Sequence, residues 1–65
     1  MISVNGTELP YKGAEDLSSF LLRTGHYSPF MVVSLNGAFL RRDDWSRCIV
    51  RDGDIIRTVD MIAGG

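Results

Sequence analysis

The sequence has little of what a disulfide scaffold, a metal site or a membrane segment requires. Cys48 is the only cysteine, so no internal disulfide can form, and this favours a reducing, cytoplasmic setting. His26 is the only histidine, which excludes a metal site built on several histidines. No stretch approaches the apolar length that spans a bilayer, and the first residues lack the pattern of a secretion signal. We therefore expect neither secretion nor membrane insertion.

Strong charge and phosphate-binding motifs are also missing. Seven basic and eight acidic residues leave a net charge of -1, so we expect no nucleic-acid partner and no anionic membrane partner. Neither G-x-x-x-x-G-K-[ST] nor G-x-G-x-x-G occurs, and we expect no bound cofactor. At 65 residues there is room for one domain, residues 1–65, with one small core.

The reactive side chains do not form a recognisable catalytic group. A Cys48–His26 pair has no third group to orient it, so we expect Cys48 to be a small buried hydrophobe and His26 a loop residue after a helix. The aspartates lack calcium-loop spacing, which favours turn and cap roles for Asp43, Asp44, Asp52 and Asp54. A mixed-charge surface, or alternatively a docking patch near the C-terminus, is expected for Arg41, Arg42, Arg47, Arg51 and Arg57. The chain is therefore not expected to be an enzyme.

What is present indicates two hairpins around one helix. Asn-Gly pairs at residues 5–6 and 36–37 predict type I′ turns, with strands at 1–4, 7–11, 30–35 and 38–40. Asp16 is a good N-cap, and Gly25 supplies a left-handed end for an amphipathic helix between them. Residues 41–48 are expected to be irregular or a single turn, with Trp45 closing the end of the core. Asp52-Gly53-Asp54 then predicts a turn into a last strand at 55–59.

This order of elements predicts an α+β fold of the β-grasp, or ubiquitin-like, type. A mixed sheet of four to five strands would pack on one main helix. In such a sheet the first and last strands lie side by side, parallel and in the middle. Residues of about 61–65, here called the tail, are expected to be flexible. The last strand would make the tail leave the fold in a defined direction.

The tail ends on Gly64-Gly65, which is the feature that best indicates a function. Two residues without side chains can lie extended in a narrow channel and bring a main-chain carboxylate into another protein's active site. The alternative is a frayed, flexible end without a role. Because no side-chain site is found, we interpret the Gly65 carboxylate as the reacting group. A carboxylate is a poor electrophile, so it needs activation, most simply by ATP-dependent adenylation on a separate enzyme.

The sequence resembles the ThiS family of sulfur carrier proteins of thiamin biosynthesis. The resemblance covers essentially the whole chain and rests on segments 33–37 (VSLNG), 52–54 (DGD) and 62–65 (IAGG), with Arg41 or Arg42 and Trp45 between them. It implies a ubiquitin-like β-grasp carrier, related to MoaD, that binds no cofactor. Arg57 and Asp60 depart from the more apolar residues expected near the last strand, and this puts partner choice in doubt.

The resemblance also implies a reaction cycle and partners. A ThiF-type enzyme uses ATP to adenylate Gly65, and sulfur from a cysteine desulfurase or persulfide carrier converts it to a thiocarboxylate. A ThiG-type thiazole synthase then takes the sulfur into the thiazole ring. Gly64, Ala63 and Ile62 are the residues that partners recognise, and the free carrier is expected to be monomeric.

Other readings of the sequence remain open. The chain could be the small subunit of molybdopterin synthase or a carrier for another metabolite, although those chains tend to be longer. It could be a ubiquitin-like modifier that links Gly65 to lysines of target proteins. It could also be a binding module that uses an exposed sheet face, with Gly64-Gly65 as an incidental end.

Overall fold

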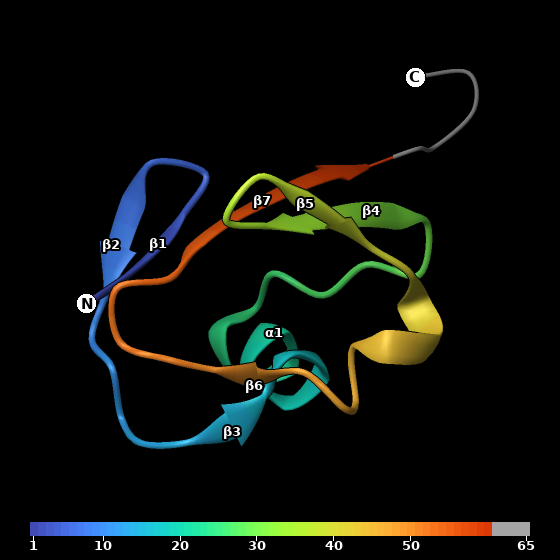
Figure 1. Cartoon of the computed structure of the whole chain (residues 1–65). Coiled ribbons are helices and arrows are strands. Elements are labelled where there is room, and N and C mark those ends of the chain that lie inside the picture. The colour runs from blue at the N-terminus through green and yellow to red at the C-terminus, as the bar shows by residue number, and fades with distance from the viewer. Residues whose placement is uncertain (61–65) are drawn as a thin grey trace.

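The computed structural model describes residues 1–60, so the predicted tail lies outside the described residues. A five-stranded sheet, one helix and a small two-stranded sheet form the fold, with the helix on one face of the large sheet (Figure 1). In chain order the elements are β1 (Ile2–Val4), β2 (Thr7–Leu9), β3 (Glu15–Asp16), α1 (Leu17–Thr24), β4 (Met31–Leu35), β5 (Ala38–Leu40), the 3₁₀ turn η1 (Arg42–Asp44), β6 (Ile49–Val50) and β7 (Ile55–Asp60). No helix within residues 1–60 is long and apolar enough to cross a membrane.

The large sheet confirms the predicted β-grasp arrangement. Its strand order is β2-β1-β7-β4-β5, so the first and last strands of the chain are neighbours at its centre. β1 and β7 run parallel, with Val4 opposite Ile56, whereas β7 and β4 run antiparallel from Leu35–Ile56 to Met31–Asp60. The sheet is therefore mixed, and β7 has a neighbouring strand on both sides at its start.

The Asn-Gly turns form as predicted. Asn5 and Asn36 both have positive φ angles, 52° and 51°, and the glycine that follows each has a φ of 86°. Positive φ at both central positions defines the type I′ turn, which matches the twist of the strands it joins. These turns set the registers Val4–Thr7 in the first hairpin and Leu35–Ala38 in the second.

Both predicted ends of the helix are also confirmed. Asp16 Oδ2 accepts a hydrogen bond of 2.9 Å from the main-chain N–H of Ser19, which is the N-cap geometry. Gly25 ends the helix with a φ of 78°, and its N–H donates back to Leu22 at 3.3 Å. Leu17, Phe20 and Leu21 are buried, so the helix covers the sheet with the face that the sequence predicts.

Trp45 lies at the end of the core, as expected. Only 2% of its surface is exposed, and its indole Nε1 donates to the main-chain oxygen of Leu40 at 3.4 Å. The rest of the buried core comes from the helix and from the inner face of the sheets: Ile2, Val4, Leu17, Phe20, Leu21, Met31, Val33, Val50 and Ile56. Trp45 is therefore the large side chain that fills the space beyond the helix and strands.

The small sheet was not predicted from the sequence. β3 and β6 pair antiparallel, with Glu15 opposite Val50 and Asp16 opposite Ile49. Each strand has two residues, too few for an alternating pattern to be recognised. The pairing holds the N-cap residue Asp16 against the segment that precedes β7.

Replacing Trp45 by alanine should remove about 3–5 kcal/mol of stability, because a buried aromatic side chain leaves a large cavity. This loss is comparable with the whole stability of a domain of this size. Urea unfolding followed by circular dichroism measures it. The matched control is Phe39→Ala, since 64% of that aromatic side chain is exposed and we expect a change within about 0.5 kcal/mol. Equal losses for the two variants would contradict the assigned core.

Stability should also depend on pH through Asp16. Hydrogen bonds from the Ser19 main chain and hydroxyl hold the pKa of Asp16 below its ordinary value of 3.8. The folded chain therefore favours the ionised form of Asp16. Its contribution to the free energy of unfolding is fully present above pH 3.8, and it is lost as the pH falls through the lowered pKa of Asp16 in the folded chain. Asp16→Asn keeps a capping oxygen but does not titrate. Urea unfolding from pH 6 to about 2 should show a steeper loss for the wild-type chain than for this variant; parallel curves would exclude the effect.

Candidate functional site

The predicted site residues are Gly65, Gly64, Ala63 and Ile62, and all four lie outside the described residues. The expected flexibility of the tail, residues 61–65, is therefore not tested. The structure does describe the strand that precedes the tail and its surroundings. These determine from which part of the fold the tail starts.

One edge of β7 is bound to the second hairpin. The main-chain N–H of Asn36 donates to the oxygen of Ile55 at 2.7 Å, and the side-chain oxygen of Asn36 accepts from the Ile55 N–H at 2.8 Å. The side-chain Nδ2 of Asn36 donates to Asp54 Oδ1 at 3.1 Å. β4 then accompanies β7 as far as the Met31–Asp60 pair. β7 is thus fixed on this side until the residue before the tail.

The other edge of β7 is bound to the first hairpin over a shorter distance. The Asn5 N–H donates to the Ile56 oxygen at 2.9 Å, after which the chain turns away. The Asn5 side chain then continues the contact, with Oδ1 accepting from the Thr58 N–H at 2.8 Å and Nδ2 donating to Thr58 Oγ1 at 2.9 Å.

The asparagines of the two turns therefore both bind β7. The sequence predicts only a turn role for Asn5 and Asn36, and it does not predict their side-chain contacts with β7. The available signal was the choice of asparagine over aspartate in both turns, since its amide can donate as well as accept.

The sheet face opposite the helix carries apolar side chains around β7. Phe39, Val59 and Ile55 are 64%, 57% and 52% exposed. Val59 lies opposite Val32, and Phe39 and Arg57 both lie opposite Ser34, so these side chains share one face. Arg57 and Ser34 lie between these apolar side chains on the same face. The patch adjoins the end of β7.

All the arginines are exposed, as predicted, but Arg42 also has a structural role that the sequence does not predict. Its guanidinium carbon lies 4.6 Å from the centre of the Trp45 ring, and Nη1 donates to the Tyr27 hydroxyl at 2.8 Å. Nη2 donates to the main-chain oxygen of Ser28 at 3.2 Å. Arg42 therefore fastens the segment before β4 to η1. Its spacing of three residues from Trp45 on one 3₁₀ turn was the signal for this contact.

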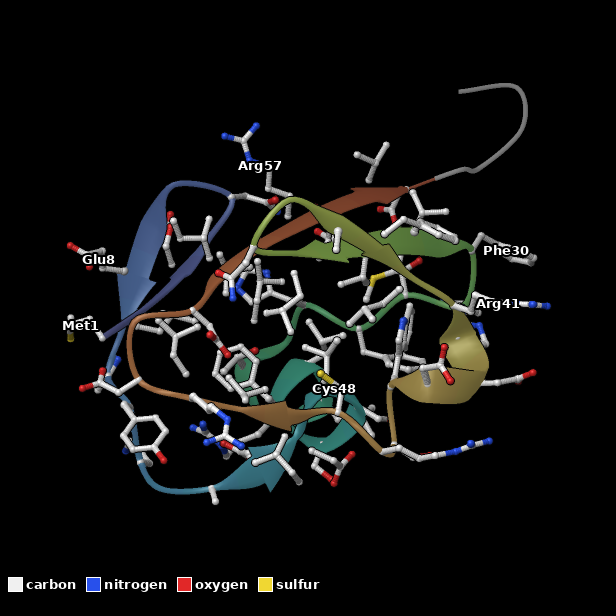
Figure 2. The ribbon with its side chains drawn as sticks, viewed as in Figure 1. Met1, Glu8, Phe30, Arg41, Cys48 and Arg57 are labelled. Carbon is white, nitrogen blue, oxygen red and sulfur yellow. The ribbon has the colours of Figure 1, made fainter. Side chains whose placement is uncertain are left out.

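Other arginines point into solvent. Figure 2 shows Arg57 projecting from the sheet face away from α1, and Arg41 projecting outward near η1. Within residues 1–60, the ion pairs are Arg23 with Glu15 and the Met1 amino group with Asp52, so none involves Arg57. Arg57 thus presents a positive charge in the middle of the exposed face of β7.

Within residues 1–60, no hydrogen bond joins the side chains of Cys48 and His26. Cys48 is half-buried against the core, and burial raises the pKa of its thiol; the carboxylates of Asp54 and Asp44 act in the same direction. A thiol with a raised pKa is a weaker nucleophile at neutral pH. The N–H of His26 donates to Leu21 just after the helix, at 2.9 Å. No group of three or more metal-binding side chains occurs among residues 1–60.

A turn role is confirmed for Asp54. Its Oδ2 accepts from the main-chain N–H of Arg51 at 2.8 Å, which closes the turn into β7. Gly53, at a φ of 92°, occupies the position of this turn that favours glycine. Asp43 and Asp44 lie in η1, within the segment predicted to be a single turn.

Comparisons with known proteins agree with this fold. A crystal structure of the thiamine biosynthesis protein ThiS from Geobacter metallireducens superposes with a TM-score of 0.79 at 24% identity, covering 98% of this chain and 97% of that chain. A solution structure of a thiamine biosynthesis protein from the same organism gives a TM-score of 0.75 at 24% identity, covering 98% and 86%. No protein-family model matches the chain.

One curated protein is similar in sequence. It comes from Archaeoglobus fulgidus, is named "Putative sulfur carrier protein", and is 37% identical over 51 residues. The match covers 78% of this chain and 58% of the relative, so the chain spans less than two thirds of that protein's length. The chain thus has the β-grasp fold of the ThiS structures, as the sequence resemblance predicts, and is similar in sequence to a protein named as a sulfur carrier.

Proposed function

We propose that this chain is a sulfur carrier protein of the ThiS type, and that Gly65 is its C-terminal residue and bears the sulfur. The observation that carries the proposal is the position of β7. It is the central strand of the sheet, is bound on both edges, and ends immediately before the tail. A tail that starts from such a strand begins at a fixed point of the fold, as delivery to an enzyme requires. The similarity to the Archaeoglobus fulgidus protein supports the same function.

The proposed chemistry uses the main chain of the tail. An oxygen of the Gly65 carboxylate attacks the α-phosphorus of ATP on a ThiF-type enzyme, and pyrophosphate leaves. The outer sulfur of a persulfide, supplied by a cysteine desulfurase or a persulfide carrier, attacks the acyl carbon, and AMP leaves. A thiol then attacks the donor's own sulfur, so a new disulfide forms between the thiol and the donor, the acyl disulfide breaks and the Gly65 thiocarboxylate leaves. The ATP belongs to the activating enzyme, and this chain is its co-substrate.

Each tail residue has a role in this proposal. Gly65 carries the reacting carbon, and Gly64 lets the backbone pass through a channel too narrow for a side chain. Ala63 and Ile62 give the partners small and apolar side chains to bind. The exposed patch of Phe39, Val59 and Ile55 lies beside the end of β7, where an enzyme that holds the tail can also contact the fold.

The receiving pathway in this proposal is thiamin biosynthesis, with a ThiG-type thiazole synthase as sulfur acceptor. The Geobacter metallireducens neighbours are thiamine biosynthesis proteins, and the likeness to them extends over almost the whole of both chains in the crystal structure. The cytoplasm is the proposed location, supported by the single cysteine, Cys48. The carrier is proposed to be monomeric when free.

Intact-mass analysis tests the proposal. After incubation with ATP, a ThiF-type enzyme and a persulfide donor, we expect one oxygen of the chain to be exchanged for one sulfur. Fragmentation should place the sulfur on the C-terminal peptide, and omission of ATP should prevent the exchange. Sulfur found on Cys48 alone, or no ATP-dependent exchange, would contradict the proposal. Covalent attachment to lysines of other proteins would indicate a modifier instead.

A further inference from the structure

A stretch of the β7 edge on the β1 side has no partner among the described residues. The parallel ladder runs through the Ser3 N–H to the Asp54 oxygen and the Asn5 N–H to the Ile56 oxygen, both at 2.9 Å. At the next step the Asn5 side-chain oxygen takes the place of a main-chain oxygen and accepts from the Thr58 N–H at 2.8 Å. The hairpin then turns back at Gly6, and the ladder stops there.

The main-chain groups beyond this point are set to continue the ladder. In an antiparallel pair alternate residues bond to the neighbouring strand, and Ile55 bonds to Asn36 on the β4 side. The main-chain N–H and C=O groups of residues 57 and 59 therefore point to β4. Those of residues 56, 58 and 60 point to the β1 side. The Thr58 oxygen and the Asp60 N–H are thus directed to the side where β1 has ended, and no described residue bonds to them.

A groove lies along the boundary between β1 and β7 and continues past the end of β1. It has a volume of about 440 Å³ and is lined by Ser3, Asn5 and Gly6 on one side and by residues 55–59 on the other. In Figure 1 the β1–β2 hairpin ends beside the first part of β7, and no labelled strand accompanies the last part on that side. An extended segment can therefore approach the open edge of β7.

The residues that line the groove determine which kind of segment can bind there. Arg57 is the only charged residue of the groove, and it has no ion pair within residues 1–60. Ile55 and Val59, both exposed, flank Arg57 at alternate positions on the same face of β7. A strand added here would contact aliphatic side chains and present a carboxylate to Arg57.

We infer that this groove binds an extended, acidic segment of the adenylating enzyme, which adds as a strand to the open edge of β7. The inference rests on the proposed function, because β7 leads directly into the tail on which that enzyme acts. A segment paired with Thr58 and Asp60 reaches the residue that precedes the tail in the sequence, so the same enzyme can hold the strand and activate Gly65. Main-chain pairing supplies affinity, and Arg57 supplies selectivity.

Kinetics with matched variants tests the acidic occupant. In ATP–pyrophosphate exchange on a ThiF-type enzyme, Arg57→Glu should raise the KM for the carrier about tenfold with kcat nearly unchanged, and added salt should narrow the difference from wild type. Arg47→Glu makes the same charge change at an exposed arginine outside the groove and should leave KM within about twofold. Equal KM values for the two variants would contradict the inference that the bound segment is acidic.

The added strand is tested at Asp60. Hydrogen exchange should show the Asp60 amide protected when the enzyme is added, whereas the Val59 amide, which already faces β4, should change little. Asp60→Pro removes the N–H, and Asp60→Ala removes only the carboxylate, so the proline variant should have a KM about fivefold above that of the alanine variant. Circular dichroism checks that both variants fold.

Other outcomes at Asp60 would overturn the inference. An amide that the enzyme does not protect would exclude the added strand. Protection that depends on carrier concentration, without enzyme, would mean that a second copy of the chain is the occupant. If the wild-type chain supports no pyrophosphate exchange, the proposed function fails and this inference fails with it. Normal exchange by Arg57→Glu and Asp60→Pro would overturn the groove alone.

Discussion

The position of β7 between β1 and β4 is the constraint on which the rest of the structure depends. A parallel pair needs a long crossover, and here the helix, the second hairpin and the β3–β6 pair all lie between the two strands in sequence. The helix covers one face of the large sheet, in which β7 is the central strand. Ile56 of β7 is fully buried. The opposite face stays open, with the exposed side chains of Ile55, Arg57 and Val59. A single strand thus joins the core to the surface that partners can reach.

The two asparagine side chains explain how β7 is held where strand pairing is incomplete. Asn36 fixes its start and Asn5 its middle, each from a type I′ turn on opposite sides of the strand. Asn5 also marks where the ladder ends, and the groove that runs along β1 and β7 extends past this point to Val59. The fold therefore provides both a fixed origin for the tail and a free edge beside it. In the proposed function, the fold positions the tail and the tail carries the chemistry.

Much of the fold could be predicted because its signals are local. The Asn-Gly turns, the Asp16 cap and the Gly25 end each depend on backbone angles that few residues adopt, and all formed as expected. Asn5 contacts Thr58 and Arg42 contacts Tyr27, and each pair is distant in sequence. Local signals indicate that Asn5 and Arg42 can make such contacts, but not which residues they bind. The β3–β6 pair is too short to have a pattern. The alternation along a strand assigns the side chains of Arg57 and Val59 to one face. The open edge of β7 could not be predicted, because it depends on where the pairing of β1 with β7 ends.

The site itself was predicted by another route. Gly64 and Gly65 were chosen because the other residues of the sequence offered no catalytic group. Both lie outside the described residues, so this choice stays a prediction. The chemistry of the site thus remains a proposal that depends on the main chain of two residues.

The central claim is that the tail acts through its backbone, and pyrophosphate exchange by a Gly64→Val variant tests it most directly. Valine adds a branched side chain at residue 64, whereas the core that stabilises the fold is built from residues 2–56. We therefore expect the urea unfolding of the variant to equal that of the wild type. The account predicts that a ThiF-type enzyme exchanges pyrophosphate with the wild-type chain and not with this variant. Normal exchange by a folded Gly64→Val chain would contradict it.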